Sequence, residues 1–185
     1  ILSIMKNLSQ NLKNNDVVIS EYSEFRYPNN IIIGRHNAID FGFVCTTKFA
    51  MGNFCHISPH VSVIGGKEAS FIMHDFCFLS SGARIVCATE KFRGDGLIGP
   101  MIPDQYKDMV LNKEVMMNKH CGVLTNGVVL PGVTMGEGSI LGANSLLKHD
   151  TEPWTIYAGN PAVPIKKRRY GTIKEYEREI YERYY

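Results

Sequence analysis

Strong net charge, long apolar runs and paired cysteines are all missing from this sequence. The formal net charge is only +2, and the basic run at residues 166–169 is too short to form a nucleic-acid surface. No stretch of about 18 apolar residues occurs, and residues 1–5 are too short for the core of a signal peptide. We therefore expect a cytoplasmic protein with no nucleic-acid partner and no membrane span.

The five cysteines form an odd set with no CxxC pair, which argues against a disulfide framework and against a zinc knuckle. We predict that they are reduced, buried packing residues, and we expect no metal site. They are Cys45, Cys55, Cys77, Cys87 and Cys121.

A length of 185 residues, with 44% hydrophobic and 21% charged residues, is typical of one globular domain. Within it, an apolar residue recurs every sixth position in three runs. These fifteen positions are Ile33, Ile39, Cys45, Met51, Ile57 and Val63, then Met73, Leu79 and Ile85, then Met117, Val123, Val129, Met135, Leu141 and Leu147.

A period of six fits neither an amphipathic helix nor an alternating strand. It fits a triangular coil in which each hexad supplies one short strand and one corner, so that three hexads close a turn. The apolar position then points inward and stacks on its counterpart one turn away. Glycines follow this position at Gly34, Gly52, Gly136 and Gly142, where we expect the corners to use positive φ.

We call the fifteen apolar positions the ladder. They divide the single domain, residues 1–185, into four parts. Residues 1–32 are expected to form an N-terminal cap and an irregular first coil, because Ile19, Phe25 and Ile31 lie two residues out of phase. Residues 33–150 form the β-helix and residues 151–171 a closing segment. A capping-box pattern at residues 172–175 predicts a C-terminal helix over residues 172–185, which packs on the coils or on a neighbouring subunit.

Two breaks interrupt the ladder, a short one at residues 64–72 and a long one at residues 88–112. Grouping the apolar positions in threes places both breaks at the same corner of successive coils. The long loop contains five residues that are too apolar for free disorder, so we expect it to reach a neighbouring subunit. They are Phe92, Leu97, Ile98, Met101 and Ile102.

The coils from Met117 onward, with Leu130-Pro131-Gly132-Val133 and the closing motif Tyr157-Ala158-Gly159-Asn160-Pro161-Ala162, resemble the hexapeptide-repeat acetyltransferases. The resemblance covers roughly residues 30–168 and includes galactoside, maltose and xenobiotic acetyltransferases and the acyltransferases of cell-surface polysaccharide synthesis. It implies a left-handed parallel β-helix, an all-β fold that is an exception to the right-handed crossover rule. It also implies a homotrimer with active sites between subunits, and acetyl-CoA as co-substrate. Residues implied to bind the cofactor are Gly142, Ala143, Lys148, Ala158, Gly159, Pro161, Lys166 and Lys167.

Acyl transfer to a hydroxyl needs a base, and galactoside and xenobiotic relatives use a histidine at the mouth of the long loop. Here Glu90 fills that place, either as a base with a raised pKa or as a residue that binds a sugar hydroxyl or pairs with Lys91 or Arg93. His74 and His60 are the second candidates for the base. Arg93, Asp95 and Tyr106 are expected to bind the acceptor.

We predict transfer of an acetyl group from acetyl-CoA to a hydroxyl or amino group of a sugar or nucleotide-activated sugar, in surface polysaccharide synthesis. Three alternatives stay open. One is an N-acetyltransferase acting on an amino sugar or an antibiotic. Another is a zinc protein similar to the γ-class carbonic anhydrases, with His56, His60 and His74 offered as ligands, although their spacing does not match that family. The third is a scaffold without catalysis.

Overall fold

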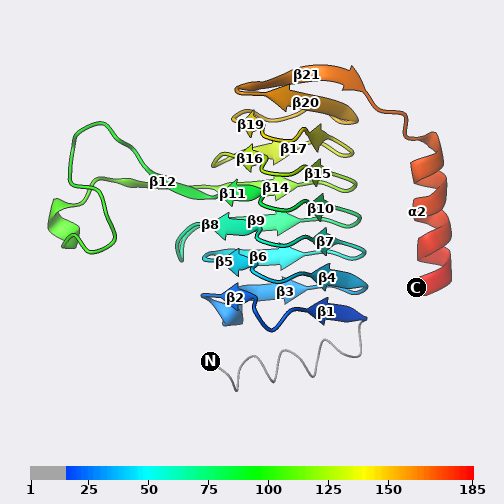
Figure 1. The fold of residues 1–185 in the computed structure, drawn as a ribbon, viewed down its shortest axis with the longest axis horizontal. Coiled ribbons are helices and arrows are strands. Elements are labelled where there is room, and N and C mark those ends of the chain that lie inside the picture. Colours follow the sequence, from blue (N-terminus) through cyan, green and yellow to red (C-terminus); the bar gives the residue numbers. More distant parts are fainter. Residues whose placement is uncertain (1–15) are drawn as a thin grey trace.

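In the computed structural model, which describes residues 16–185, the chain winds into a triangular spiral of parallel strands (Figure 1). Sheet A contains β1 (Val17–Ile19), β4 (Asn37–Ile39), β7 (His56–Ile57), β10 (Phe78–Leu79), β15 (Gly122–Val123), β18 (Ile140–Leu141), β20 (Thr155–Gly159) and β21 (Ala162–Lys167). Sheet B contains β2 (Glu24–Phe25), β5 (Val44–Cys45), β8 (Ser62–Ile64), β11 (Arg84–Val86), β16 (Val128–Val129) and β19 (Leu146–Leu147). Sheet C contains β3 (Ile31–Ile33), β6 (Lys48–Met51), β9 (Ser70–Met73), β14 (Glu114–Met117) and β17 (Thr134–Met135).

The predicted ladder forms the interior of this spiral. In sheet C, Ile33, Met51, Met73, Met117 and Met135 are partners in successive coils, and the four methionines are buried. Burying one such side chain contributes about 1.5–3 kcal/mol. Strands of two to four residues, too short to be stable alone, are therefore held by the stack. The prediction of a left-handed parallel β-helix with a protruding loop and a C-terminal helix is confirmed.

The first coil pairs strand by strand with the second, and its irregularity is confined to one corner. Ile19 is paired with Ile39, Phe25 with Cys45, and Ile33 with Met51. The two extra residues that shift the phase lie in a 3-10 turn, η1 (Pro28–Asn30), at the corner between sheets B and C. A corner can absorb an insertion because it takes no part in the sheet register. Apart from Asp16, the expected cap at residues 1–16 lies outside the described residues.

The glycines that follow the ladder positions are needed because adjacent coils pack closely there, and not because the backbone adopts positive φ. Gly34, Gly52, Gly136 and Gly142 are absent from the residues with positive φ. A Cβ on Gly34 would lie 2.5 Å from the Gly52 carbonyl oxygen, and one on Gly136 would lie 2.5 Å from the Thr151 carbonyl oxygen. Adjacent coils thus approach too closely for a side chain at these two positions, which lie at the corner between sheets C and A. Gly142 lies at the corner between sheets A and B, where a Cβ would be 2.9 Å from the Cβ of Ala158.

The C-terminal helix α2 (Gly171–Tyr184) begins one residue earlier than predicted, and no capping box forms. Tyr170 is the N-cap residue and makes no side-chain capping bond. Thr172 is already the second helical residue, so its hydroxyl is past the position from which a cap can accept a backbone N–H.

α2 packs along one edge of its own β-helix (Figure 1), which answers a question that the sequence left open. We call this edge, between sheets C and A, the helix corner. Five aromatic rings form a column along this edge. The centroids of neighbouring rings lie 4.7–5.6 Å apart, and each of the five residues has positive φ. Tyr181 packs edge-on against the third ring and Tyr184 against the first two. The residues of this aromatic column are His36, Phe54, Phe76, His120 and Trp154.

A charged network fixes the middle of α2 to the helix corner. Glu177 is only 8% exposed, and its carboxylate accepts hydrogen bonds from Lys119 at 2.7 Å and Lys174 at 2.8 Å, with His120 Nε2 at 3.1 Å. Burial opposes ionisation of Glu177, but these hydrogen bonds outweigh it and lower its pKa from 4.5 to about 2. The ionised form of Glu177 therefore stabilises the docked helix.

Replacing Glu177 with Gln should lower the melting temperature at neutral pH by roughly 5 °C, because Lys119 loses its counter-charge and Lys174 keeps only Glu137. A lowered folded-state pKa contributes stability above the unfolded value of about 4.5, and this is lost as pH falls towards about 2. The difference between wild type and variant should therefore shrink below about pH 4.5. Thermal melts across this range test it, with the exposed Glu179→Gln as control. A difference independent of pH would contradict this account.

Candidate active site

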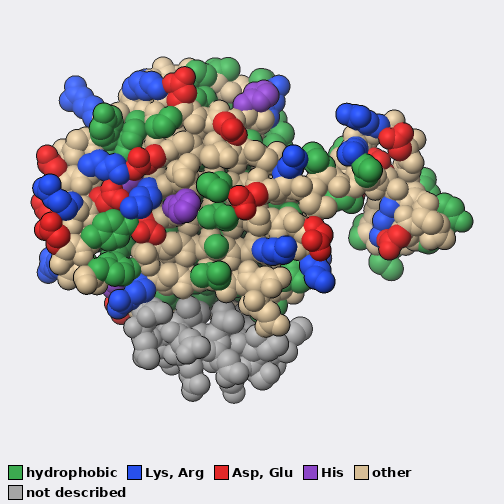
Figure 2. All heavy atoms as spheres, turned by 180° about the vertical axis from the view of Figure 1, so that it is seen from behind, with side chains coloured by type: hydrophobic (Ala, Val, Ile, Leu, Met, Phe, Trp, Pro, Cys, Tyr) green, Lys and Arg blue, Asp and Glu red, His purple; other side chains and the backbone are tan. Residues whose placement is uncertain are grey.

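The most prominent feature outside the β-helix is an arm, residues 88–112, that stands away from the body (Figures 1 and 2). Its base is an antiparallel pair, β12 (Ala88–Glu90) and β13 (Val110–Asn112), and a 3-10 turn, η2 (Asp104–Tyr106), lies in its loop. Figure 2 shows hydrophobic side chains on the part farthest from the body. The large apolar residues exposed on the arm are Phe92, Leu97, Ile98, Met101, Tyr106, Met109 and Val110.

The arm and the shorter break leave the same corner, between sheets B and C, as the sequence predicted. We call it the loop corner. The short break is a turn at residues 65–69 between β8 and β9. It is anchored by the buried Thr47, whose hydroxyl lies 2.9 Å from the Gly66 carbonyl oxygen and 2.6 Å from that of Ala69. The two excursions therefore lie one above the other on successive coils.

Glu90, the first candidate for the base, lies at the outer end of β12 and is partly exposed. Within residues 16–185 it forms no ion pair, so the suggested pairing with Lys91 or Arg93 is not formed. The Lys91 ammonium lies instead 2.7 Å from the sulfur of Met109. The Glu90 carboxylate is thus free to meet a substrate.

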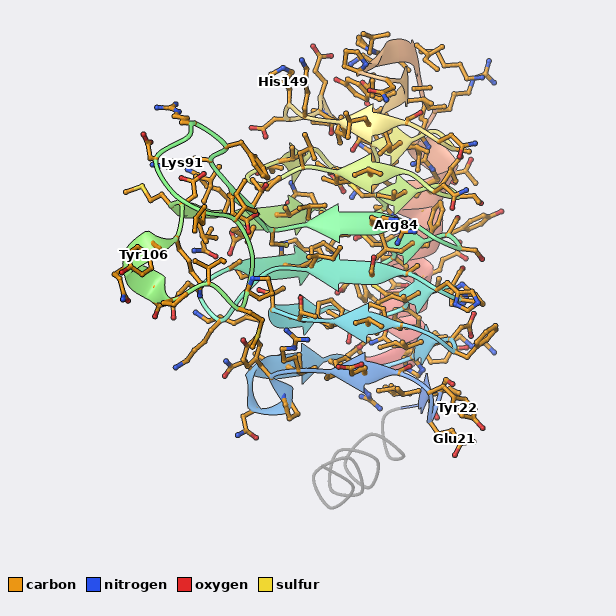
Figure 3. All side chains as sticks on the ribbon, turned by 60° about the vertical axis from the view of Figure 1, so that its left-hand side comes forward. Glu21, Tyr22, Arg84, Lys91, Tyr106 and His149 are labelled. Atoms are coloured by element: carbon orange, nitrogen blue, oxygen red, sulfur yellow. The ribbon has the colours of Figure 1, made fainter. Side chains whose placement is uncertain are left out.

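The three residues predicted to bind the acceptor share the arm with Glu90. Arg93 and Asp95 follow β12 in the loop and are exposed. Tyr106 lies in η2 and is also exposed, and Figure 3 shows it on the arm together with Lys91. The arm therefore gathers a free carboxylate, a guanidinium and a phenol. One further arm residue, Asp108, is buried, and no sequence pattern marks it.

The candidate histidines lie at the other two corners. His74 follows β9 at the helix corner and is exposed. His60 lies between sheets A and B, where its ring packs edge-on against Phe41 at 4.7 Å. We call this edge, with Gly42, His60, Gly82, Asn126 and Asn144, the asparagine corner. Within one chain the structure therefore does not bring Glu90, His74 and His60 together.

The histidines suggested as zinc ligands do not converge within the chain either, since His56 pairs with Asp40 on sheet A at 3.0 Å. In the described part of the chain, only His120, Glu137 and Glu177 place three possible ligand atoms close together. Lys174 bonds both carboxylates of this group, and Lys119 bonds Glu177 as well. These ammonium groups occupy the space and charge that a metal ion would need.

Four residues implied to bind the cofactor converge at the upper end of the asparagine corner. The Gly142 amide donates to the Tyr157 carbonyl oxygen at 2.7 Å, and the Gly159 amide donates to the Ser145 hydroxyl at 2.9 Å. A Cβ on Gly142 would lie 2.9 Å from the Cβ of Ala158. Ala143 is exposed beside them. This end of the corner therefore consists mainly of backbone and small side chains.

The remaining cofactor candidates are dispersed. Pro161 lies in the turn between β20 and β21, where its carbonyl oxygen would contact a Cβ on Gly159. Lys166 is exposed at the other end of this hairpin, whereas Lys167 pairs with Glu152 at 2.6 Å and with the Thr155 hydroxyl. Lys148 is exposed at the loop corner. Among the lysines, Lys166 lies on the same hairpin as Gly159 without an ion pair to another described residue.

All five cysteines are free and buried, as predicted. Burial raises the pKa of Cys45 to about 11, and those of Cys55 and Cys87 to about 12. Hydrogen bonds from Cys77 and Ser139 lower the pKa of Cys121, but its side chain is inaccessible. A buried thiol that solvent cannot reach is a poor nucleophile, so the site contains no catalytic cysteine.

A triangular β-helix with an arm at one corner and a closing hairpin over another defines a hexapeptide-repeat protein, and comparisons specify which kind. No protein-family model matches the chain. It is 30% identical over 168 residues to the dTDP-4-amino-4,6-dideoxy-D-glucose acyltransferase of Escherichia coli, covering 88% of this chain and 82% of that protein. It is 28% identical to a probable macrolide acetyltransferase of Lysinibacillus sphaericus, over 61% of this chain and 67% of that protein.

Among solved structures, the N-acyltransferase AntD of Bacillus cereus, in complex with dTDP and 3-hydroxybutyryl-CoA, superimposes with a TM-score of 0.85. The identity is 32%, with 94% of this chain and 95% of that chain covered. The chain belongs to the hexapeptide-repeat, left-handed β-helix acyltransferases, and it is an enzyme of that family.

Native protein should resist thiol reagents, because its five thiols are buried and three of them have pKa values of about 11 or 12. Titration with a disulfide reagent at about pH 8 should detect less than about one thiol in the folded protein. After unfolding in guanidinium the same reagent should detect all five. Rapid modification of one thiol in the folded protein, with loss of activity, would overturn the exclusion of a catalytic cysteine.

Proposed function

We propose that the enzyme transfers an acyl group from acyl-CoA to the amino group of a dTDP-linked amino sugar. The observation that supports this most is the similarity, along nearly the whole chain, to two enzymes of that description. One variant of the Bacillus cereus enzyme was solved with dTDP-4-amino-4,6-dideoxyglucose and coenzyme A, at 33% identity to this chain. The sequence left a hydroxyl and an amine open as acceptors, and the proposal chooses the amine.

The arm suits an amine because it contains a carboxylate and no histidine. The neutral amine attacks the thioester carbonyl carbon, a C–N bond forms and the C–S bond breaks. The nitrogen gives up one proton to the Glu90 carboxylate, and the sulfur leaves as the thiolate of coenzyme A, which then takes up a proton. A neutral amine is already nucleophilic and becomes strongly acidic once bonded to the carbonyl carbon, so a weak base suffices.

The donor would lie along the asparagine corner and the closing hairpin. The residues there are small, namely Gly142, Ala143, Ala158 and Gly159, so the pantetheine chain would meet backbone and short side chains, and Pro161 borders the same turn. Lys166 would meet a phosphate as a point charge. Lys167 could do so only by leaving Glu152, and Lys148 only from a different corner.

The acceptor would lie against the arm. Arg93 offers a planar guanidinium that suits the oxygens of a diphosphate, whereas Asp95 and Tyr106 offer hydrogen bonds to a sugar. All three are exposed in the isolated chain, as residues that await a ligand would be.

We further propose a homotrimer in which the arm of one subunit covers a corner of the next. This arrangement would join Glu90 on the loop corner to residues at the asparagine corner, which lie apart in one chain. It would also cover the exposed apolar residues of the arm. No helix of the described residues is long and apolar enough to cross a membrane. A cytoplasmic location is proposed because acyl-CoA and nucleotide sugars are cytoplasmic metabolites.

The acceptor class is tested by following thiol release from acetyl-CoA and 3-hydroxybutyryl-CoA with a panel of acceptors. We expect turnover with dTDP-4-amino-4,6-dideoxyglucose and none with the same sugar carrying a 4-hydroxyl. A macrolide belongs in the panel, because the similarity to a macrolide acetyltransferase supports an antibiotic as the second candidate acceptor. Turnover with the macrolide alone would replace the proposed acceptor.

Replacing Glu90 with Gln should lower kcat by at least about tenfold, because the amide cannot take up the proton. The dissociation constant for acyl-CoA should change little, since the donor would lie on a different corner. Steady-state kinetics and calorimetric titration with coenzyme A measure these two effects, with the exposed Glu175→Gln on α2 as control. Near-normal turnover would remove Glu90 from the role of base.

A further inference from the structure

The arm is tied together by very little regular structure. Only three residue pairs join β12 to β13, and one more backbone bond, from the Lys91 amide to the Met109 carbonyl oxygen, extends this ladder. Beyond it the loop contains the short turn η2 and one isolated bridge, between Leu97 and Lys107 (Figure 3). Residues that act at the outer end of such an arm need another constraint to hold their direction.

Asp108 supplies that constraint. It is 4% exposed, and one carboxylate oxygen accepts the Phe92 amide at 2.8 Å while the other accepts the Met109 amide at 2.7 Å. Its own amide donates to the Leu97 carbonyl oxygen at 2.9 Å. One residue therefore connects the outgoing strand, the loop and the returning strand.

No cation accounts for the burial of Asp108. In the part of the chain that the structure describes, no ammonium or guanidinium group lies within ion-pair distance of it. The neighbouring Lys107 pairs with Asp104. A buried carboxylate without a cation persists only where hydrogen bonds to its oxygens compensate for lost hydration. The backbone amides of Phe92 and Met109 therefore replace the lost hydration of this carboxylate, one at each oxygen.

The backbone that Asp108 holds is itself unusual. Phe92 has a φ of 52°, a conformation that bulky side chains rarely adopt, and its ring is 62% exposed. Packing of the ring within the arm therefore cannot be what maintains this conformation. The hydrogen bond from the Phe92 amide to Asp108 can maintain it, and Phe92 is only two residues beyond Glu90. Fixing Phe92 thus fixes the outer end of the strand that carries Glu90.

We propose that Asp108 is a positioning residue for the acyl transfer, acting through the backbone of residues 90–92 to hold the Glu90 carboxylate towards the acceptor. The inference rests on the proposed function, in which Glu90 takes the proton. A loose arm would still bind acyl-CoA on the other corner, but it would present Glu90 to the amine only part of the time.

The test compares Asp108→Ala and Asp108→Asn with Asp104→Asn, a control on the same arm whose carboxylate is 95% exposed. We expect Asp108→Ala to lower kcat/KM for the amino sugar by at least about tenfold, with KM for acyl-CoA within about twofold of wild type. The kcat/KM of Asp108→Asn should lie between those of wild type and Asp108→Ala, because the single amide oxygen of Asn can accept only one of the two backbone hydrogen bonds. Asp104→Asn should behave as wild type.

A double-mutant cycle separates positioning from general support of the fold. If Asp108 acts through Glu90, adding Asp108→Ala to the Glu90→Gln variant should cost less than about threefold more activity. A full multiplicative loss would overturn the proposal, and so would a parallel loss of acyl-CoA binding and melting temperature in Asp108→Ala.

Hydrogen exchange provides a readout that does not depend on substrate. The amides of Phe92 and Met109 should exchange faster in Asp108→Ala, whereas those of β9 and β14 should not change. Unchanged exchange in the arm would overturn the proposal. If instead wild-type protein acylates no amino sugar, or Glu90→Gln is fully active, the proposed function fails, and the exchange result still decides whether Asp108 orders the arm.

Discussion

Stacking of each coil on the next, in exact register, is the constraint on which the rest of this structure depends. Parallel strands of two to four residues cannot be stable alone, and each exists because its backbone bonds and inward side chain meet equivalents in the adjacent coils. Ile33 and the four aligned methionines of sheet C show this register over five coils. A residue inserted within a strand would turn every later side chain of that strand to the wrong face.

Insertions are consequently confined to corners, and the loop corner accommodates all of the larger ones. The turn at η1, the turn at residues 65–69 and the arm all leave between sheets B and C, from the first, third and fourth coils. Because the body remains rigid, an arm placed there can vary in sequence without cost to the core. In the proposed mechanism, Glu90 and the buried Asp108 of the arm serve acyl transfer and not the stability of the spiral.

The helix corner and the asparagine corner both contain residues with positive φ, but different residue types adopt this conformation. At the helix corner bulky aromatic residues adopt positive φ, and their rings stack and are covered by α2. At the asparagine corner Asn126 and Asn144 adopt it, with two glycines and His60 on other coils. The first corner is closed by a helix with a charged inner face. The second stays open beside the closing hairpin, and this difference decides which corner could accept a long, thin cofactor.

The sequence by itself determined the period of six, the grouping into coils, the shared corner of the two breaks and the burial of the cysteines, because each follows from residue spacing along a regular path. It misjudged the start of α2 and the purpose of the glycines after the ladder. Those depend on distances between coils, such as the approach of Gly34 to Gly52. Only the tertiary structure decided that α2 docks on its own coils and that Asp108 is buried in the arm. The reason is physical: these facts concern which distant atoms meet, and a hexad pattern specifies only which side chains face inward.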